Sequence, residues 1–294
     1  AQQRTAMAMA QQRAREAVQR FEMAHFGLVA ATQRSQSVPP IDAAPPSAVV
    51  ASSDGDVGRC PFALTRFFAC GEGGALVAVL LTNEPMYTNG YGANMLHLHA
   101  FDASLTDLIH ATAPVVTRFE LVQLPLAGHF PPALLARFST LRMLRISRTS
   151  LYGELDLRGV AGTLRRVDVT HNLFDSVRFA AHHALTHIDV HANLLSGTLA
   201  ELFNVTTTGA LLRNAEHLDV SENLLTGHAS PSGVEAPPRL STCKMQLSAH
   251  SAALNSNRFC VAHFDAGTGS HVRVENAFNS TKCRTLVHTW CFSA

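Results

Sequence analysis

The chain has few charged residues and no long apolar run. Asp, Glu, Lys and Arg make up only 15% of its 294 residues, and the formal net charge is +1. This balance excludes a generic nucleic-acid binder, which would show a basic face. A membrane-spanning helix needs about 18 or more apolar residues in succession, and no such run occurs.

Catalytic motifs are missing as well. The sequence has no Gly-x-Ser-x-Gly, no His-Glu-x-x-His and no phosphate loop, and the glycines at 71–74 lack the spacing of a dinucleotide fingerprint. We therefore predict a non-enzymatic protein without a cofactor.

The middle of the chain also lacks cysteine, because all six cysteines lie toward the two ends. They are Cys60, Cys70, Cys243, Cys260, Cys283 and Cys291. An even number in this arrangement predicts disulfide-stapled ends in an oxidising compartment. We expect Cys60 to pair with Cys70, whereas the other four cysteines allow three connectivities. Zinc binding is disfavoured because no Cys-x-x-Cys pair occurs.

A repeated apolar pattern fills the cysteine-free region. Apolar ladders run into an Asn and then a Leu or Phe at 164–174, 185–197 and 218–227, and at 141–153 Thr149 takes the place of the Asn. This pattern is the signature of the leucine-rich repeat. It predicts an α/β solenoid, an arc of short parallel strands in which stacking between neighbouring coils supplies the stability.

Each fixed position of the repeat has a physical role. Ladder residues alternate between the core and the solvent, and the Asn amide satisfies backbone groups of its own coil and the next. The predicted Asn ladder comprises Asn172, Asn193, Asn223 and Asn257. The Leu-x-Gly that follows, as at 151–153 and 195–197, resembles plant-type repeats, which add a second extended segment after the Gly.

The solenoid is expected to extend beyond the clear copies. A coil at 116–131 puts Leu124 in the Asn position, and weaker coils are expected at Leu96/Leu98 and at Ala78/Leu80 with Asn83. The stretch 203–214 is an insertion, and 254–259 is a degenerate last coil. Together these give seven or eight coils.

We divide the chain into five segments: an N-terminal helical segment (1–32), a Pro/Ser/Ala-rich connector (33–56), an N-terminal cap (57–75), the repeats (76–260) and a C-terminal cap (261–294). Helical spacing of Ala14, Ala17/Val18, Phe21, Ala24/His25 and Leu28 predicts one apolar stripe. The favoured interpretation is a helix that caps the first coil. The alternative is an arm, including residues 1–13, that docks on a neighbouring molecule.

Polar residues between the ladder positions should form two columns on the concave face of the solenoid. One column contains Glu120, Arg145, Asp168, Asp189 and Asp219, and the column two residues earlier contains Arg118, Met143, Arg166, His187 and His217; His171 and His191 lie a little further along. Stacked carboxylates repel one another, and we expect the adjacent Arg and His to compensate them. This face is the predicted binding site.

A metal site formed by His187, Asp189, His217 and Asp219 is the alternative for this face, because neighbouring strands bring such side chains within reach. Solvated His–Asp pairing explains the same columns, and we favour it. The sequence prediction is therefore that no metal binds.

Two glycosylation sequons begin at Asn204 and Asn279. The sequence also starts at Ala1 without Met, as a processed chain does. Together with the cysteines, these features predict an extracellular or cell-surface location. The last residues, 289–294, are equally compatible with a lipid anchor attached after residue 294 and with simple truncation.

The repeats at 193–199 and 221–227, the paired N-terminal cysteines and the closing segment 255–260 resemble the kinetoplastid promastigote surface antigen and proteophosphoglycan group. Plant extracellular leucine-rich-repeat ectodomains are similar in the same repeats. The resemblance implies a secreted or lipid-anchored surface glycoprotein that acts in adhesion. The predicted function is recognition of a protein or glycan ligand. The alternative is a structural subunit of a coat or filament that assembles through the N-terminal arm and the C-terminal cap.

Overall fold

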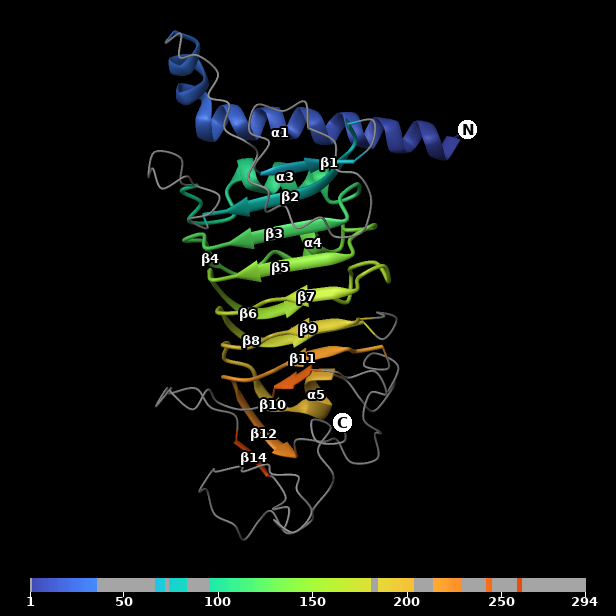
Figure 1. Cartoon of the computed structure of the whole chain (residues 1–294), viewed down its shortest axis with the longest axis vertical. Helices are drawn as coiled ribbons and strands as arrows, with labels where there is room; N and C mark the ends of the chain where they lie inside the picture. Colours follow the sequence, from blue (N-terminus) through green and yellow to red (C-terminus); the bar gives the residue numbers. More distant parts are fainter. Residues whose placement is uncertain are drawn as a thin grey trace.

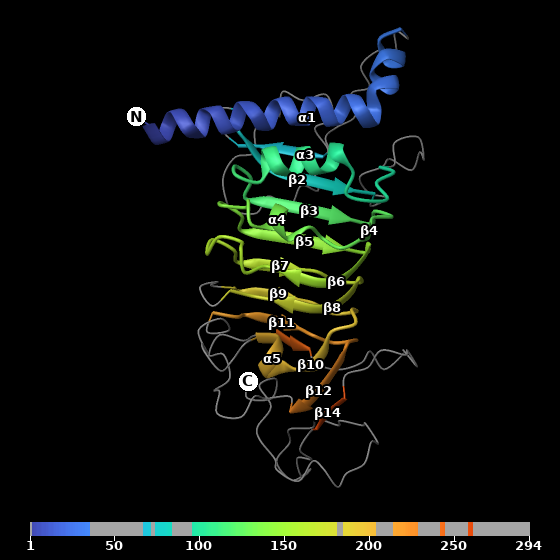
Figure 2. The same cartoon turned by 180° about the vertical axis from the view of Figure 1, so that it is seen from behind.

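The chain folds as a leucine-rich-repeat solenoid. The computed structural model describes residues 2–35, 67–71, 74–83, 96–180, 185–203, 214–228, 242–244 and 258–260. Its strands are stacked along the long axis of the molecule, and one long helix lies across the end where the stack begins (Figure 1). The view from behind shows the same single stack (Figure 2).

The main sheet has eight strands, and after the first they all run parallel. In spatial order they are β1 (Phe68–Cys70), β2 (Leu76–Thr82), β3 (Arg118–Val122), β5 (Met143–Ser147), β7 (Arg166–Asp168), β9 (His187–Asp189), β11 (His217–Asp219) and β13 (Thr242–Lys244). Only β1 is antiparallel to its neighbour, β2. The regular order follows from the repeat, since each coil adds one strand at about 4.8 Å.

The opposite side of the solenoid carries two three-stranded parallel sheets. One contains β4 (Ala127–Gly128), β6 (Ser150–Asp156) and β8 (Leu173–Arg178); the other contains β10 (Ser196–Thr198), β12 (Leu224–His228) and β14 (Arg258–Cys260). These strands are the second extended segments predicted from Leu-x-Gly. Gly153 and Gly197 have φ angles of 79° and 87°, a conformation that side chains other than hydrogen disfavour.

Short helices complete the coils: α3 (Ala103–Thr112), α4 (Pro132–Leu135) and α5 (Leu199–Phe203). The sequence prediction missed α3, whose N-terminus is capped by the Asp102 carboxylate accepting from the Leu105 N–H. The separate coil predicted at Leu96/Leu98 is wrong, because β2 pairs directly with β3. Residues 96–112 instead form the far side of the β2 coil.

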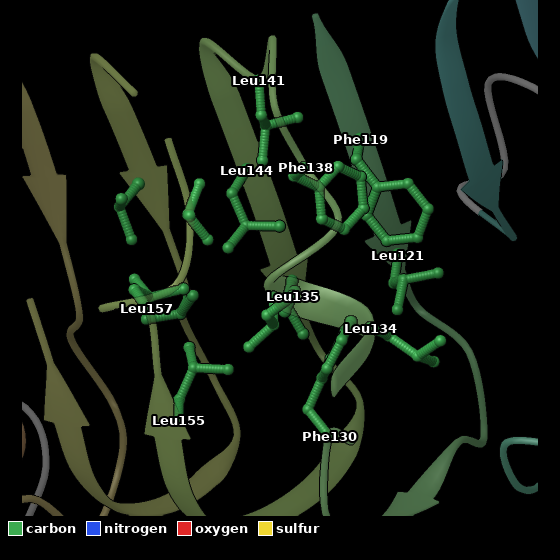
Figure 3. Close-up of a cluster of buried hydrophobic side chains, with 14 of the residues drawn as sticks. Phe119, Leu121, Phe130, Leu134, Leu135, Phe138, Leu141, Leu144, Leu155 and Leu157 are labelled. Atoms are coloured by element: carbon green, nitrogen blue, oxygen red, sulfur yellow. The ribbon is translucent and has the colours of Figure 1, made fainter. Parts of the chain in front are cut away.

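The core is a continuous apolar column between the sheets. Phe119, Phe138 and Leu144 approach one another beneath the main sheet, and Phe130 and Leu155 lie further toward the second sheet (Figure 3). All five side chains are buried. Each fully buried side chain of this size contributes about 1.5–3 kcal/mol to stability. Because the side chains of successive coils pack in one column, removing one affects neighbouring coils as well as its own.

The Asn positions have the predicted register, including the two irregular ones. A residue in the left-handed region, with φ of 53–54°, directly precedes five of the slots: Gln123, Arg148, His171, Ala192 and Glu222 precede Leu124, Thr149, Asn172, Asn193 and Asn223. Asn83 differs, because it follows Thr82, the last residue of strand β2. The shared backbone conformation shows that Leu124 and Thr149 occupy the same turn as the asparagines.

The Asn side chains tie each coil to the preceding coil rather than to the next. Asn193 Nδ2 donates to the carbonyls of Val169 at 2.6 Å and of Val190 at 3.1 Å, and its Oδ1 accepts from the Phe174 N–H. Asn83 is an exception, because its side chain donates to the carbonyl of Leu96 and accepts from the N–H of Leu96 within its own coil. Asn257, the last predicted member, lies outside the described residues.

Helix α1 (Gln2–Ser35) caps the first coil. Ala14, Ala17, Val18 and Phe21 are buried, and the Gln11 side chain both donates to and accepts from the Leu76 backbone. The predicted arm at residues 1–13 therefore includes part of this cap. Ala24 of the predicted stripe is exposed, since His25 takes the inward position and its ring lies 4.4 Å from that of Phe21.

The cysteines do not all lie outside the repeats. Cys70 is disulfide-bonded, and Cys243 lies in β13, in register with Leu218 of the apolar ladder. Cys243 is thus part of the main sheet, and the expectation that the repeats lack cysteine is wrong. Cys260 ends β14, whereas Cys60, Cys283 and Cys291 lie outside the described residues. Within the described residues, no helix has the length and apolarity needed to cross a membrane.

Candidate functional site

The strand pairing aligns the two predicted columns on the solvent side of the main sheet, the predicted concave face. The first column pairs Glu120 with Arg145, Arg145 with Asp168, Asp168 with Asp189, and Asp189 with Asp219. The second column aligns Arg118, Met143, Arg166, His187 and His217. All the predicted binding residues of these two columns are therefore brought together along one surface.

Arginine neutralises the carboxylates on β3, β5 and β7. Arg118 Nε lies 2.5 Å from Glu120 Oε1, and Arg145 Nε lies 3.1 Å from Asp168 Oδ2. Arg145 also approaches Glu120, with 3.9 Å between Nη1 and Oε2. The side chain of Glu120 is only 7% exposed, so the two guanidinium groups replace most of its water. We call Arg118, Glu120, Arg145 and Asp168 the arginine network.

Histidine takes over this role on β9 and β11. His191 Nδ1 lies 2.6 Å from Asp189 Oδ1, and His217 Nε2 lies 3.9 Å from Asp189 Oδ2. One ligand atom each from Asp189, His191 and Asp219 lie within 4.8 Å of one another. We call Asp189, His191, His217 and Asp219 the His–Asp cluster.

Asp219 differs from the predicted picture of an exposed binding residue. It is only 3% exposed, and its Oδ1 accepts from the N–H of Ser221 at 3.1 Å and from the hydroxyl of Ser221 at 2.5 Å. The expectation that the adjacent column compensates the stacked carboxylates holds for Glu120 with Arg118. Asp168 also pairs with Arg145 of its own column, and Asp219 accepts hydrogen bonds from Ser221 two residues onward.

The pKa shifts follow from these contacts. Burial raises the pKa of Asp189, but its hydrogen bonds and charge interactions with His191 lower it by more, so the net shift is downward. The hydrogen bond to Asp189 raises the pKa of His191. Burial lowers the pKa values of His171 and His187, and neighbouring positive charges add to this effect. One histidine of this face is therefore stabilised as a cation and two are stabilised as neutral rings.

A third column of hydroxyl and imidazole groups lies two residues further along the chain, and the sequence prediction included only His191 of its members. Ser147 and Thr170 hydrogen-bond each other at 2.7 Å, and Thr170 also donates to Asp168. His191 and Ser221 occupy the corresponding place on the following coils, two residues after Asp189 and Asp219. A polar residue two positions after Arg145, Asp168, Asp189 and Asp219 is the signal that would have identified the other members.

Two other predicted site residues, Arg166 and His187, lie beside these groups. Arg166 is exposed between the arginine network and the His–Asp cluster. The His187 and His217 rings stack at 5.8 Å, and His187 Nδ1 lies 3.1 Å from the Thr186 hydroxyl rather than close to a carboxylate. Both predicted glycosylation sites, Asn204 and Asn279, lie outside the described residues.

Neither a protein-family model nor a curated protein sequence matches the chain. Among solved structures, it is similar to Pollen Receptor Kinase 3, with 20% identity and a TM-score of 0.43 over 60% of this chain and 76% of that one. It is also similar to two Arabidopsis receptor ectodomains. For GASSHO1/SCHENGEN3 the identity is 20% and the TM-score 0.39, over 49% of this chain and 16% of that one. For HAESA the identity is 16% and the TM-score 0.39, over 65% and 37%. The chain thus spans well under half the length of these two ectodomains.

Proposed function

We propose that this chain is a non-enzymatic recognition module that binds a protein or glycan ligand on its concave face. The observation that supports this proposal is the alignment of charged and imidazole side chains across consecutive parallel strands. These side chains lie between the apolar ladder positions and share one face of the main sheet. A row of hydrogen-bonding groups at about 4.8 Å intervals matches an extended polar ligand.

A selection experiment followed by charge reversal tests this proposal. The purified chain is screened against a displayed random-peptide library and a glycan array, and the selected ligands are then tested on variants. We expect Arg166→Glu and Asp168→Lys to weaken binding at least tenfold, because both residues lie in the middle of the face. Asp219 is unsuitable for charge reversal, since its buried carboxylate supports the fold.

The matched control is Arg178→Glu on the opposite sheet, where Arg178 is paired with Glu154 on the surface. Binding should be unchanged in this variant. Equal losses in all three variants, or no loss at Arg166 and Asp168, would place the binding site elsewhere.

We also propose a secreted or cell-surface location. The six cysteines, the disulfide at Cys70, the two sequons and the resemblance to the promastigote surface antigen group support this proposal. A lipid anchor and sugar at Asn204 and Asn279 belong to the same proposal. Expression in a eukaryotic secretory system should produce a chain whose mobility shifts after N-glycosidase treatment. Free thiols in the secreted product, or no shift, would argue against it.

Self-assembly through the N-terminal helix is the second candidate function. The first turns of α1 project past the strand stack (Figure 1), and Met7 and Met9 there are about half exposed. A truncation that ends before Gln11 leaves the contacts of the cap intact. Light scattering at high concentration, with and without residues 1–8, distinguishes the two functions: a monomer in both cases would rule out assembly through this helix.

A further inference from the structure

We propose that the His–Asp cluster binds a divalent transition-metal ion, with Asp189, His191 and Asp219 as ligands and His217 completing the site. The proposal does not depend on ligand recognition by the concave face. It also corrects the set of residues considered from sequence, because His191 replaces His187.

Strand geometry brings the four side chains together. Asp189 and Asp219 are direct partners on the neighbouring strands β9 and β11. Residues two apart along an extended chain point to the same side, so His191 joins Asp189 and His217 joins Asp219. Two acid–imidazole pairs therefore face the same solvent side of adjacent parallel strands, near the lower end of the stack in Figure 1.

The distances suit a compact cation. Ligand atoms around tetrahedral zinc lie about 3.3 Å apart when each is about 2.0–2.1 Å from the metal. The atoms offered by Asp189, His191 and Asp219 lie within 4.8 Å of one another, and His217 Nε2 is 3.9 Å from Asp189 Oδ2. Binding requires His191 Nδ1 and Asp189 Oδ1, now 2.6 Å apart, to separate by less than 1 Å as the metal replaces the proton between them.

The surroundings hold one ligand still and leave the others accessible. Ser221 donates twice to Asp219 Oδ1, which fixes this buried carboxylate as outer-shell hydrogen bonds do in known metal sites. Asp189, His191 and His217 have side chains that are 24–25% exposed. An ion can thus enter from solvent and meet a carboxylate that is already oriented.

The donor types define the class of metal. Two imidazole nitrogens and two carboxylate oxygens suit Zn²⁺, Co²⁺, Ni²⁺ and Cu²⁺. Ca²⁺ and Mg²⁺ prefer oxygen ligands alone, and no thiolate is present among these four residues to select a soft ion. The arginine network on β3, β5 and β7 offers no comparable site, because guanidinium groups fill the space between its carboxylates.

Calorimetric titration of the full chain with Zn²⁺ alone, after dialysis against EDTA, tests the proposal. We expect one stoichiometric site, and we expect His191→Gln and Asp189→Asn each to weaken it at least tenfold. His110→Gln is the matched control, since it removes an exposed histidine of α3 outside the His–Asp cluster, and the Zn²⁺ affinity of this variant should stay within twofold. Co²⁺ should give the intense visible absorption of a tetrahedral site in the wild type and in His110→Gln only.

The absence of stoichiometric Zn²⁺ binding would overturn the proposal. So would equal losses in His110→Gln and His191→Gln, which would point to nonspecific binding by the 16 histidines of the chain. Far-UV circular dichroism checks the fold of each variant. If Asp189→Asn fails to fold, His191→Gln decides, because its side chain is partly exposed and remains polar. Since the probe is the metal alone, failure here leaves the proposed ligand recognition untouched.

Discussion

Two pairs of neighbouring coils use the same backbone with different chemistry. The coils of β3 and β5 have Leu124 and Thr149 in the Asn position, and arginine side chains neutralise the carboxylates of their concave face. The coils of β9 and β11 have Asn193 and Asn223 in the Asn position, and histidine pairs with the carboxylate Asp189 of their concave face. The left-handed residue before each slot is common to all four coils.

This difference separates what the repeat requires from what each coil is free to vary. The backbone conformation of the turn after the strand is the same in all four coils, whereas the side chain in the Asn position differs between them. Arginine keeps its charge at every physiological pH, but histidine does not. The first pair of coils is therefore permanently neutralised, and the second is sensitive to protons and cations.

The largest expected effect comes from the Asn position itself. Asn193→Ala removes the side-chain partner of the Val169 carbonyl and of the Phe174 N–H, whereas the Val190 carbonyl still accepts from Asn223 Nδ2. Each such group costs about 1–3 kcal/mol, so we expect the free energy of unfolding to fall by about 3 kcal/mol or more. Urea denaturation followed by circular dichroism measures the loss.

The matched variant in the other pair of coils is Thr149→Val, which preserves shape and removes the hydroxyl bond to Asn172. Asn172 Oδ1 still accepts from the Thr149 N–H, so the expected loss is about 1 kcal/mol. Similar losses in the two variants would contradict the idea that the slot is tied more strongly in the second pair of coils.

A smaller effect is expected from breaking the arginine network. Glu120→Gln keeps the volume but leaves Arg118 and Arg145 facing each other without the carboxylate. A hydrogen bond to a charged group contributes about 1.5–3 kcal/mol. Because both arginines are partly exposed, we expect the free energy of unfolding to fall by an amount at the lower end of this range. The shift of the urea midpoint measures it.

The control for this prediction is Glu154→Gln, which breaks the exposed pair with Arg178 on the opposite sheet. An exposed pair of this kind contributes about 0–1 kcal/mol. If Glu154→Gln were as damaging as Glu120→Gln, burial of Glu120 would not be the reason for its contribution.

The sequence predicts the regular parts of this comparison well. The strands, the Asn register and both polar columns follow from a period that every coil repeats. The prediction failed where one coil departs from the period. Helix α3 fills an enlarged β2 coil, and Cys243 continues the apolar ladder without the leucines that mark the other copies.

The prediction also missed which polar groups pair. The ladder places Asp168, Asp189 and Asp219 in one column, but the choice of partner depends on side-chain conformation and burial. Asp168 pairs with Arg145 on the preceding strand, Asp189 with His191 along its own chain, and Asp219 with Ser221. Periodicity contains no information on that choice.

The smallest expected effect is a pH dependence confined to the histidine-balanced coils. His191 has a pKa raised above 6.5 by Asp189, so the stability it contributes is fully present below pH 6.5 and is lost as the pH rises through its folded pKa. Asp189 has a pKa lowered below 3.8, so its contribution is present above pH 3.8 and is lost as the pH falls through its folded pKa. The pair is therefore most stabilising between these two limits.

The difference in unfolding free energy between the wild type and His191→Gln isolates this pair, measured with EDTA at pH 6 and pH 8.5. It should be larger at pH 6, by up to about 1 kcal/mol, the range of partly exposed pairs. Taking the difference removes most of the opposite trend of His171 and His187, whose lowered pKa values favour the fold at high pH. The charged and titratable groups around the His191 ring are Asp189, Asp219, Glu222, His171 and His217.

The control is the difference in unfolding free energy between the wild type and Glu120→Gln. This difference should not change between the two pH values, because arginine keeps its proton. A pH dependence of equal size in both variants would remove the distinction between the two pairs of coils.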